Sequence, residues 1–376
     1  MDRRCFIGHA GAAGAVLALP RMIADAAVTE RNRERRSLWI DAQGVIDGFE
    51  PNTSERYILG ERLLAALGKS KLDAMSITIG PVGNGPDRLR LALEDLTRID
   101  RLVTDYPSLL TRVERVGDID VAGRAGQLGL IYNFQDTTPL EGDAGNVAMF
   151  AARGVRVMQL TYNRRNLAGD GCLETANGGL TKFGQEVIGA MEEAHILLDL
   201  SHAGQRTITE AIEASGQPMA ITHSGCRDLV DWPRNTRDTE MRALAEKGGV
   251  FGVFLMPFLR NRGQPGVDDL FRHLDHAVNI CGEDHVAIGT DNPMLGYKID
   301  DAARRQHREN HETRIAMGIA APGEQPDVLL YVEGYNGPDR FGKIGDDLSR
   351  RGWKRRRIDK VLGGNFARLL REVWRD

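Results

Sequence analysis

Two histidines and one aspartate occupy positions at which they could form a single chemical centre. His202 and His223 lie at the ends of two successive apolar runs, ILLDLSH and MAITHS, and Asp291 ends a third run, HVAIGTD. If the runs are parallel strands, their C-terminal ends meet at one edge of the sheet and the three side chains converge. Imidazoles and a carboxylate bind metals and transfer protons. A lone histidine is more often a satisfied loop residue, but the three together predict a metal or acid–base centre.

The strands needed to position these side chains recur along the chain. Eight short runs are apolar on both faces, as buried parallel strands are. They span 38–43, 75–80, 127–135, 155–163, 196–202, 219–224, 249–257 and 285–291. Three of the other runs also finish on a polar residue, namely Gln43, Gln135 and Asn163.

Amphipathic helices are expected between most of these strands. Residues 86–104 begin with a proline, and residues 181–194 begin with a capping threonine. Eight alternations of strand and helix within about 250 residues are typical of a (β/α)8 barrel of the TIM type, a fold in the α/β class. A doubly wound open sheet is the alternative, but no G-x-G-x-x-G turn follows the first strand.

The composition of the chain is that of a globular protein and argues against nucleic acid as a partner. The chain has 376 residues, of which 41% are hydrophobic and 27% charged, an ordinary globular balance. The net charge of −4 provides no basic excess for a phosphate backbone, so nucleic acid is not an expected partner. Four cysteines in a chain of this length do not make a disulfide scaffold.

The N-terminus reads as an export signal. Arg3 and Arg4 precede a short Ala/Gly-rich apolar run, and a small-x-small cleavage site ends at residue 26. The pair resembles a twin-arginine signal, so we expect residues 1–26 to direct export to a bacterial periplasm through the twin-arginine machinery. The run is too short for a stable membrane span, and a frayed N-terminal helix is the alternative. Residues 27–376 are then expected to form a single barrel domain.

Several motifs resemble the renal or membrane dipeptidase family. They follow the family's order over nearly all of the mature chain: GLTKFGQEVIGAMEEAHILLDLSH, ITHSGCRDLVDWPRN, HVAIGTDN and VLGGNFARLL. That family resembles the amidohydrolase superfamily of metal-dependent barrels and hydrolyses dipeptides, usually with two zinc ions. The resemblance implies a small dipeptide-like substrate and, because family members are often dimers, a homodimer as one form of assembly.

The resemblance also implies roles for individual residues. His202 and His223 match the histidines that bind the second metal. Arg234 matches the arginine that holds the substrate carboxylate, a task suited to the planar guanidinium fork. Asp291 matches the aspartate that handles the proton of the attacking water.

The chain departs from the family at the first metal. Where the family has Asp-Gly-His-x-Asp, this sequence has Asp-Ala-Gln-Gly-Val, so Gln43 replaces a histidine ligand and Val45 an aspartate ligand. The bridging glutamate is replaced by Gln135, a neutral amide that bridges two cations poorly. A substrate-site histidine is replaced by Tyr162. The first metal site is therefore expected to be lost.

Three interpretations follow from these replacements. One Zn²⁺ per chain could remain on His202 and His223, with Gln135 and Gln43 as weak further ligands. Alternatively, the Gly-rich loop after the fourth strand could supply new ligands, Cys172 and Glu174. In the third interpretation the fold has abandoned metal, and the same mouth binds or transforms a carboxylated ligand.

The leading prediction is an exported metal-dependent hydrolase of a dipeptide or related N-acyl amino acid. Asp291 would be the general base, Arg234 and Asn163 would bind substrate, and Tyr162 would donate a hydrogen bond to the substrate or oxyanion. The alternatives are a lyase- or isomerase-type enzyme acting on a modified peptide, and a catalytically silent periplasmic binding protein for carboxylated ligands. A long insertion at about 293–345, with the charged run RRQHRENHETR, is expected to be a solvated lid or an oligomer contact.

Overall fold

A computed structural model of the chain describes residues 37–49, 57–316, 318 and 320–375. The predicted signal at 1–26 lies outside the described residues. None of the described helices is both long and apolar enough to cross a bilayer.

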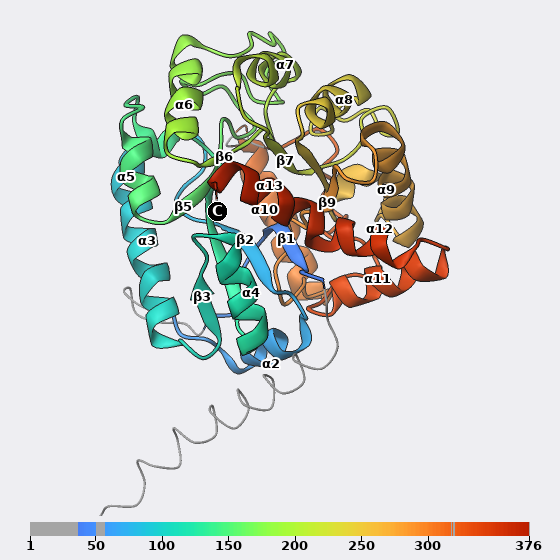
Figure 1. The fold of residues 1–376 in the computed structure, drawn as a ribbon. Helices are drawn as coiled ribbons and strands as arrows, with labels where there is room; N and C mark the ends of the chain where they lie inside the picture. Colours follow the sequence, from blue (N-terminus) through green and yellow to red (C-terminus); the bar gives the residue numbers. More distant parts are fainter. Residues whose placement is uncertain (1–36, 50–56, 317, 319, 376) are drawn as a thin grey trace, which may run out of the picture.

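At the centre of the molecule, the described residues form a parallel sheet of nine strands (Figure 1). Eight follow the order β1-β2-β4-β5-β6-β7-β8-β9, and β3 pairs with β4 at its side. The strands are β1 (Ile40–Gly44), β2 (Ala74–Thr78), β3 (Leu110–Arg112), β4 (Leu128–Phe134), β5 (Val155–Gln159), β6 (Leu197–Asp199), β7 (Ala220–Ser224), β8 (Val250–Val253) and β9 (Val286–Ile288).

The sheet closes between its first and last strands. The Asp291 amide donates to the Gln43 carbonyl at 2.8 Å, and the Met294 amide donates to the Val45 carbonyl at 2.8 Å. These bonds join β1 to the segment after β9, so the predicted (β/α)8 barrel is confirmed. All eight predicted strands are present, whereas β3 was not predicted because only Leu110 of its three residues is buried.

Helices alternate with the strands and cover the outside of the barrel (Figure 1). Both helices singled out in the sequence are confirmed as α3 and α6, and the Thr181 hydroxyl caps α6 by accepting from the Gly184 amide at 3.0 Å. The helices are α2 (Glu61–Lys69), α3 (Arg88–Asp105), α4 (Val116–Ala125), α5 (Asn146–Ala152), α6 (Lys182–Glu193), α7 (Gln205–Ala214), α8 (Asp238–Glu246), α9 (Val267–Cys281), α10 (Asp301–Ala316), α11 (Arg340–Arg350), α12 (Arg355–Asp359) and α13 (Asn365–Trp374), with short segments η1 (Thr138–Leu140), η2 (Pro257–Leu259) and η3 (Lys360–Gly364).

One end of the barrel is filled with apolar side chains. Residues at the beginnings of strands, such as Ile40, Leu197 and Val250, form one buried cluster with Phe366 and Leu370 of α13. In Figure 1 this helix, in dark red, crosses in front of the barrel strands. Because α13 covers the N-terminal ends of the strands, the C-terminal ends are left for the polar groups that follow them.

Candidate active site

His202 and His223 lie side by side at the C-terminal end of the barrel. Their Nε2 atoms are 3.0 Å apart, and both rings are almost completely buried. His202 follows β6 in a left-handed conformation, with φ at 61°, which turns its side chain towards β7. The predicted convergence of these two histidines is therefore what the structure shows.

The other nitrogen of each ring has its own partner. His202 Nδ1 lies 2.6 Å from Asn163 Oδ1, so this nitrogen carries the proton and donates. His223 Nδ1 lies 2.8 Å from Thr222 Oγ1, and the Thr222 hydroxyl donates its only proton to Asp199 Oδ2 at 2.6 Å. The hydroxyl must therefore accept from His223 Nδ1–H, and both Nε2 atoms present lone pairs.

These lone pairs face each other without a proton between them. Burial, together with the nearby Arg234 guanidinium, lowers the pKa of His202 and of His223 well below the usual value, so both rings are neutral. Two facing lone pairs at 3.0 Å repel unless a cation lies between them. Nitrogens at this separation can both bind one Zn²⁺ at about 2.0–2.1 Å, so the pair fits as two ligands of one metal.

Arg234 lies beside the histidines and is only 4% exposed. Its Nη2 donates to the His223 carbonyl at 2.9 Å, and its guanidinium lies over the Phe254 ring, 5.4 Å from the centroid. Its buried Nη1 has no hydrogen-bond partner among the residues that the structure describes. A buried N–H without a partner is costly, so this group has donors available for a carboxylate.

Asp291 follows β9 and also has a left-handed backbone, with φ at 54°. Burial raises the pKa of its carboxyl to about 6, although the positive charges of Arg234 and Arg314 lower it. A carboxylate whose pKa lies this close to neutrality can both accept a proton and release it.

Tyr162 and Asn163 follow β5. The Tyr162 ring stacks on His202 with 4.3 Å between ring centroids, and its side chain forms a hydrogen bond with Arg314. Asn163, which the sequence suggested as a substrate contact, uses its Oδ1 to orient His202.

The residues at the expected first metal position form a different structure. Gln43 Nε2 donates to Thr78 Oγ1 at 2.9 Å, and Gln43 Oε1 accepts from Asn133 Nδ2 at 3.0 Å. Val45 is apolar and 39% exposed. The Gln135 carbonyl accepts from Gln159 Nε2 at 2.7 Å. This donor set does not fit a first metal, and among the described residues no group of three or more His, Cys, Asp or Glu side chains is arranged as a metal site.

The loop after the fourth predicted strand separates its two suggested ligands. Cys172 Sγ lies 3.5 Å from Asn163 Oδ1, and burial raises the pKa of this thiol to about 11. Glu174 instead turns to its own loop, where it accepts from the Arg165 amide at 3.1 Å.

Because the Cys172 thiol donates to Asn163 Oδ1, a bond that a serine hydroxyl can also make, we expect Cys172→Ser to retain metal content and to change kcat/KM by no more than about threefold. Elemental analysis and steady-state kinetics of the variant measure this. Loss of bound metal in the serine variant would show that Cys172 is a ligand.

A cavity of about 550 Å³ opens next to this group of side chains. Cys172 and Pro233 form part of its wall, and Ala320 and Pro322 of the insertion form another part. A cavity of this size accommodates a small organic ligand. The cavity therefore lies beside the site, where Cys172 contacts Asn163 and Pro233 precedes Arg234.

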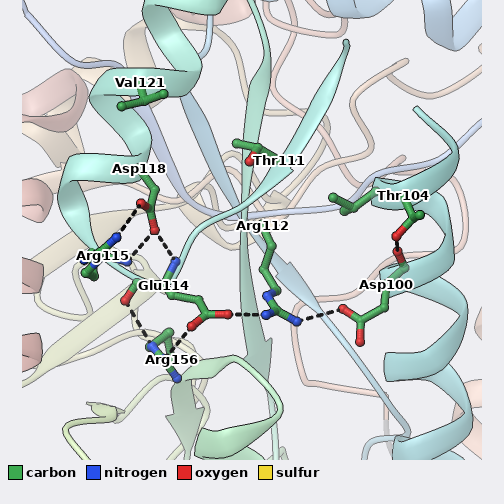
Figure 2. Close-up of a pocket in the computed structure, with 10 residues that line it drawn as sticks. Asp100, Thr104, Thr111, Arg112, Glu114, Arg115, Asp118, Val121 and Arg156 are labelled. Atoms are coloured by element: carbon green, nitrogen blue, oxygen red, sulfur yellow. Dashed lines mark hydrogen bonds and ion pairs between the residues drawn. The ribbon is translucent and has the colours of Figure 1, made fainter. Parts of the chain in front are cut away.

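A larger cavity, of about 920 Å³, lies on the outer side of the barrel between α3 and α4 (Figure 2). Its arginines already have carboxylate partners, since Arg112 bonds Asp100 and Glu114, and Arg156 also bonds Glu114. These charges neutralise one another and leave little to attract a charged ligand.

The comparisons with known proteins agree with this geometry. The family model for membrane dipeptidase, peptidase family M19, matches residues 62–303. The chain belongs to the membrane dipeptidase family. It is therefore related to metal-dependent peptidases, and its general class is that of a dipeptidase-like hydrolase.

Relatives and solved structures extend the match. A Klebsiella pneumoniae protein from the pqqA 5′ region is 26% identical, with 77% of this chain and 98% of that protein aligned. Dipeptidase 3 of rat is 26% identical over 76% of this chain but only 53% of its own length. An amidohydrolase from Pseudomonas aeruginosa has a TM-score of 0.77 and 28% identity, covering 95% of this chain and 99% of that one.

This family member also contains site residues that the sequence did not reveal. Arg314 is part of the charged run that the sequence predicts as a solvated lid or an oligomer contact, and its guanidinium interacts with Tyr162. Thr222 and Asp199, which fix the His223 tautomer, lie within the quoted motifs but carry no signal of that role. Only the three-dimensional arrangement connects them.

Proposed function

We propose that the chain hydrolyses the amide bond of a dipeptide or a related N-acyl amino acid, with one Zn²⁺ held by His202 and His223. The observation that carries this proposal is the bond from Arg234 Nη2 to the His223 carbonyl at 2.9 Å. This bond supports the proposal because Arg234 lies next to the two imidazoles, so that a substrate bound to it by a terminal carboxylate would have its amide bond near the histidines.

The protein side chains then have separate tasks. Arg234 binds the substrate carboxylate, and Asp291 accepts a proton from the attacking water. The water oxygen bonds to the carbonyl carbon, the C–N bond breaks, and Asp291 returns the proton to the leaving amine. The Tyr162 hydroxyl donates to the oxygen that becomes negative. A metal bound at the histidines would polarise the scissile carbonyl.

The function is tested by incubating zinc-supplemented protein with a panel of dipeptides and measuring the amine that is released. We expect turnover that requires a free C-terminal carboxylate and is lost in His223→Ala. A panel without any hydrolysed member, at zinc concentrations that load the protein, would contradict the proposal.

Export is a separate proposal. Arg3 and Arg4, followed by the apolar run, support a twin-arginine signal over residues 1–26. Residues 27–376 would then be the periplasmic enzyme, exported in a folded form.

A further inference from the structure

One side chain of the insertion after β9, that of Arg314, lies at the end of the barrel. Helix α10 has no buried residue among those described, but the Arg314 side chain near its end is only 30% exposed. The Arg314 guanidinium donates from Nε to Glu324 Oε2 at 2.9 Å and from Nη2 to Glu324 Oε1 at 2.8 Å. Because Glu324 is 8% exposed and bound at both oxygens, this ion pair holds the guanidinium in one orientation.

Burial raises the pKa of Tyr162, and the Arg314 guanidinium opposes this rise as a positively charged, hydrogen-bonding neighbour of the phenol. Guanidinium has only donors, so the tyrosine oxygen accepts and its own proton must point elsewhere. The Tyr162 ring is fixed in turn by stacking on His202. A second hydrogen bond joins the insertion to the segment after β5, since Arg164 Nε donates to the Gly318 carbonyl at 2.6 Å.

The positive charge of Arg314 also acts on other groups of the site. The Arg314 charge acts on both Asp291 and His202, so it lies within range of the reacting groups. The neutral Gln43 and Val45 occupy the place where the family's first metal ligands are expected. A guanidinium that polarises a phenol makes the phenol a stronger donor to a developing negative oxygen.

We propose that Arg314 is a positioning residue of the hydrolytic site, which orients the Tyr162 hydroxyl towards the developing oxyanion. The insertion is therefore part of the active site and completes it from outside the barrel. This inference rests on the proposed hydrolysis. It adds a chain of two hydrogen bonds, in which Arg314 donates to the Tyr162 phenol while the phenol donates to the carbonyl oxygen of the substrate.

Kinetics of four proteins test the relation between these residues. We expect Arg314→Met to lower kcat by about 10²-fold, the effect of losing one oxyanion donor, with KM changed by less than about threefold. Tyr162→Phe should do the same, and the double variant should be no slower than Tyr162→Phe alone. Losses that multiply in the double variant, or an effect on KM alone, would overturn the assignment.

A matched control separates positioning from damage to the helix. Arg308 lies on the same helix and is paired with Asp327 at 3.0 Å, far more exposed than the Arg314 pair. Arg308→Met should leave kcat unchanged. Guanidinium chloride at millimolar concentration should restore part of the activity of Arg314→Ala and none of that of Tyr162→Phe.

Binding gives a readout that does not require turnover. The probe is a phosphinate analogue of alanyl-alanine, which mimics the tetrahedral oxyanion, and free alanine is the control ligand for the carboxylate anchor. Calorimetry should show at least tenfold weaker phosphinate binding in Arg314→Met, with alanine binding unchanged. If the wild-type protein cleaves no dipeptide but shows this pattern, the hydrolytic proposal fails and the positioning role stands. Equal weakening of both ligands, or no phosphinate binding by the wild-type protein, would refute the role of Arg314.

Discussion

Asp291→Asn is expected to lower kcat by about 10³-fold while dipeptide binding persists, because general base catalysis contributes about 10²–10⁴-fold. Asparagine keeps the size of the side chain but cannot accept the proton of the attacking water. Stopped assays of amine release, with substrate affinity measured by calorimetry, separate the two effects.

The pH dependence should identify the same group. Because burial raises the Asp291 pKa to about 6, wild-type kcat/KM should fall about tenfold per pH unit below that value. The histidine pKa values lie well below the usual range, so protonation of His202 or His223 should not produce this limb. The residual activity of Asp291→Asn should not show this fall of kcat/KM at low pH. If the variant loses activity below pH 6 as the wild-type protein does, the titrating group is not Asp291.

The raised pKa also has a cost in stability. A carboxyl whose folded-state pKa exceeds its unfolded value favours the folded state most below pH 3.8, and this contribution is lost as pH rises through about 6. At pH 7.5 the charge should cost roughly 2 kcal/mol, because the Asp291 side chain is partly exposed and solvent screens part of its charge. Asp291→Asn should therefore unfold at higher denaturant concentration than the wild-type protein at pH 7.5, and the two should converge near pH 4.

Arg234→Met should lower kcat/KM for dipeptides by about 10²–10³-fold, mainly through KM, because a buried charge-assisted contact to the substrate carboxylate is lost. Lysine at this position keeps the charge but not the fork, so Arg234→Lys should recover only part of the loss.

A substrate pair controls for indirect damage to His223, whose carbonyl Arg234 also contacts. The wild-type enzyme should cleave a dipeptide with a free carboxylate at least about 10²-fold better than the same dipeptide capped as an amide. Arg234→Met should treat the two alike. A wild-type enzyme that cleaves both equally would show that Arg234 does not bind the carboxylate.

The barrel could be predicted from sequence because eight of its strands carry continuous apolar runs, most of which end on a polar residue. His202, His223 and Asp291 were recognisable for the same reason, since strand ends must meet once the sheet closes. The sequence did not predict β3, because this three-residue edge strand has two partly buried polar residues and therefore no continuous apolar run.

The contacts around the site could not be predicted, because they join residues far apart in the chain. The sequence presents Gln43 as the replacement of a histidine ligand and as a weak further ligand, and its bonds to Thr78 and Asn133 depend on the register of three strands. Arg314 lies in a helix with no buried residue among those described, so its local pattern resembles any charged surface. Such pairings become visible only when the loops of the barrel are placed together.

If His202 and His223 share one metal, as we propose, the metal content per chain must depend on both histidines. Protein purified without chelators and without added metal is analysed by elemental mass spectrometry, beside His223→Ala and Cys172→Ser. We predict about one zinc ion per chain in the wild-type and Cys172→Ser proteins, and almost none in His223→Ala. Wild-type protein that holds no divalent metal after zinc loading and removal of the excess, or zinc that persists in His223→Ala, would contradict the shared site.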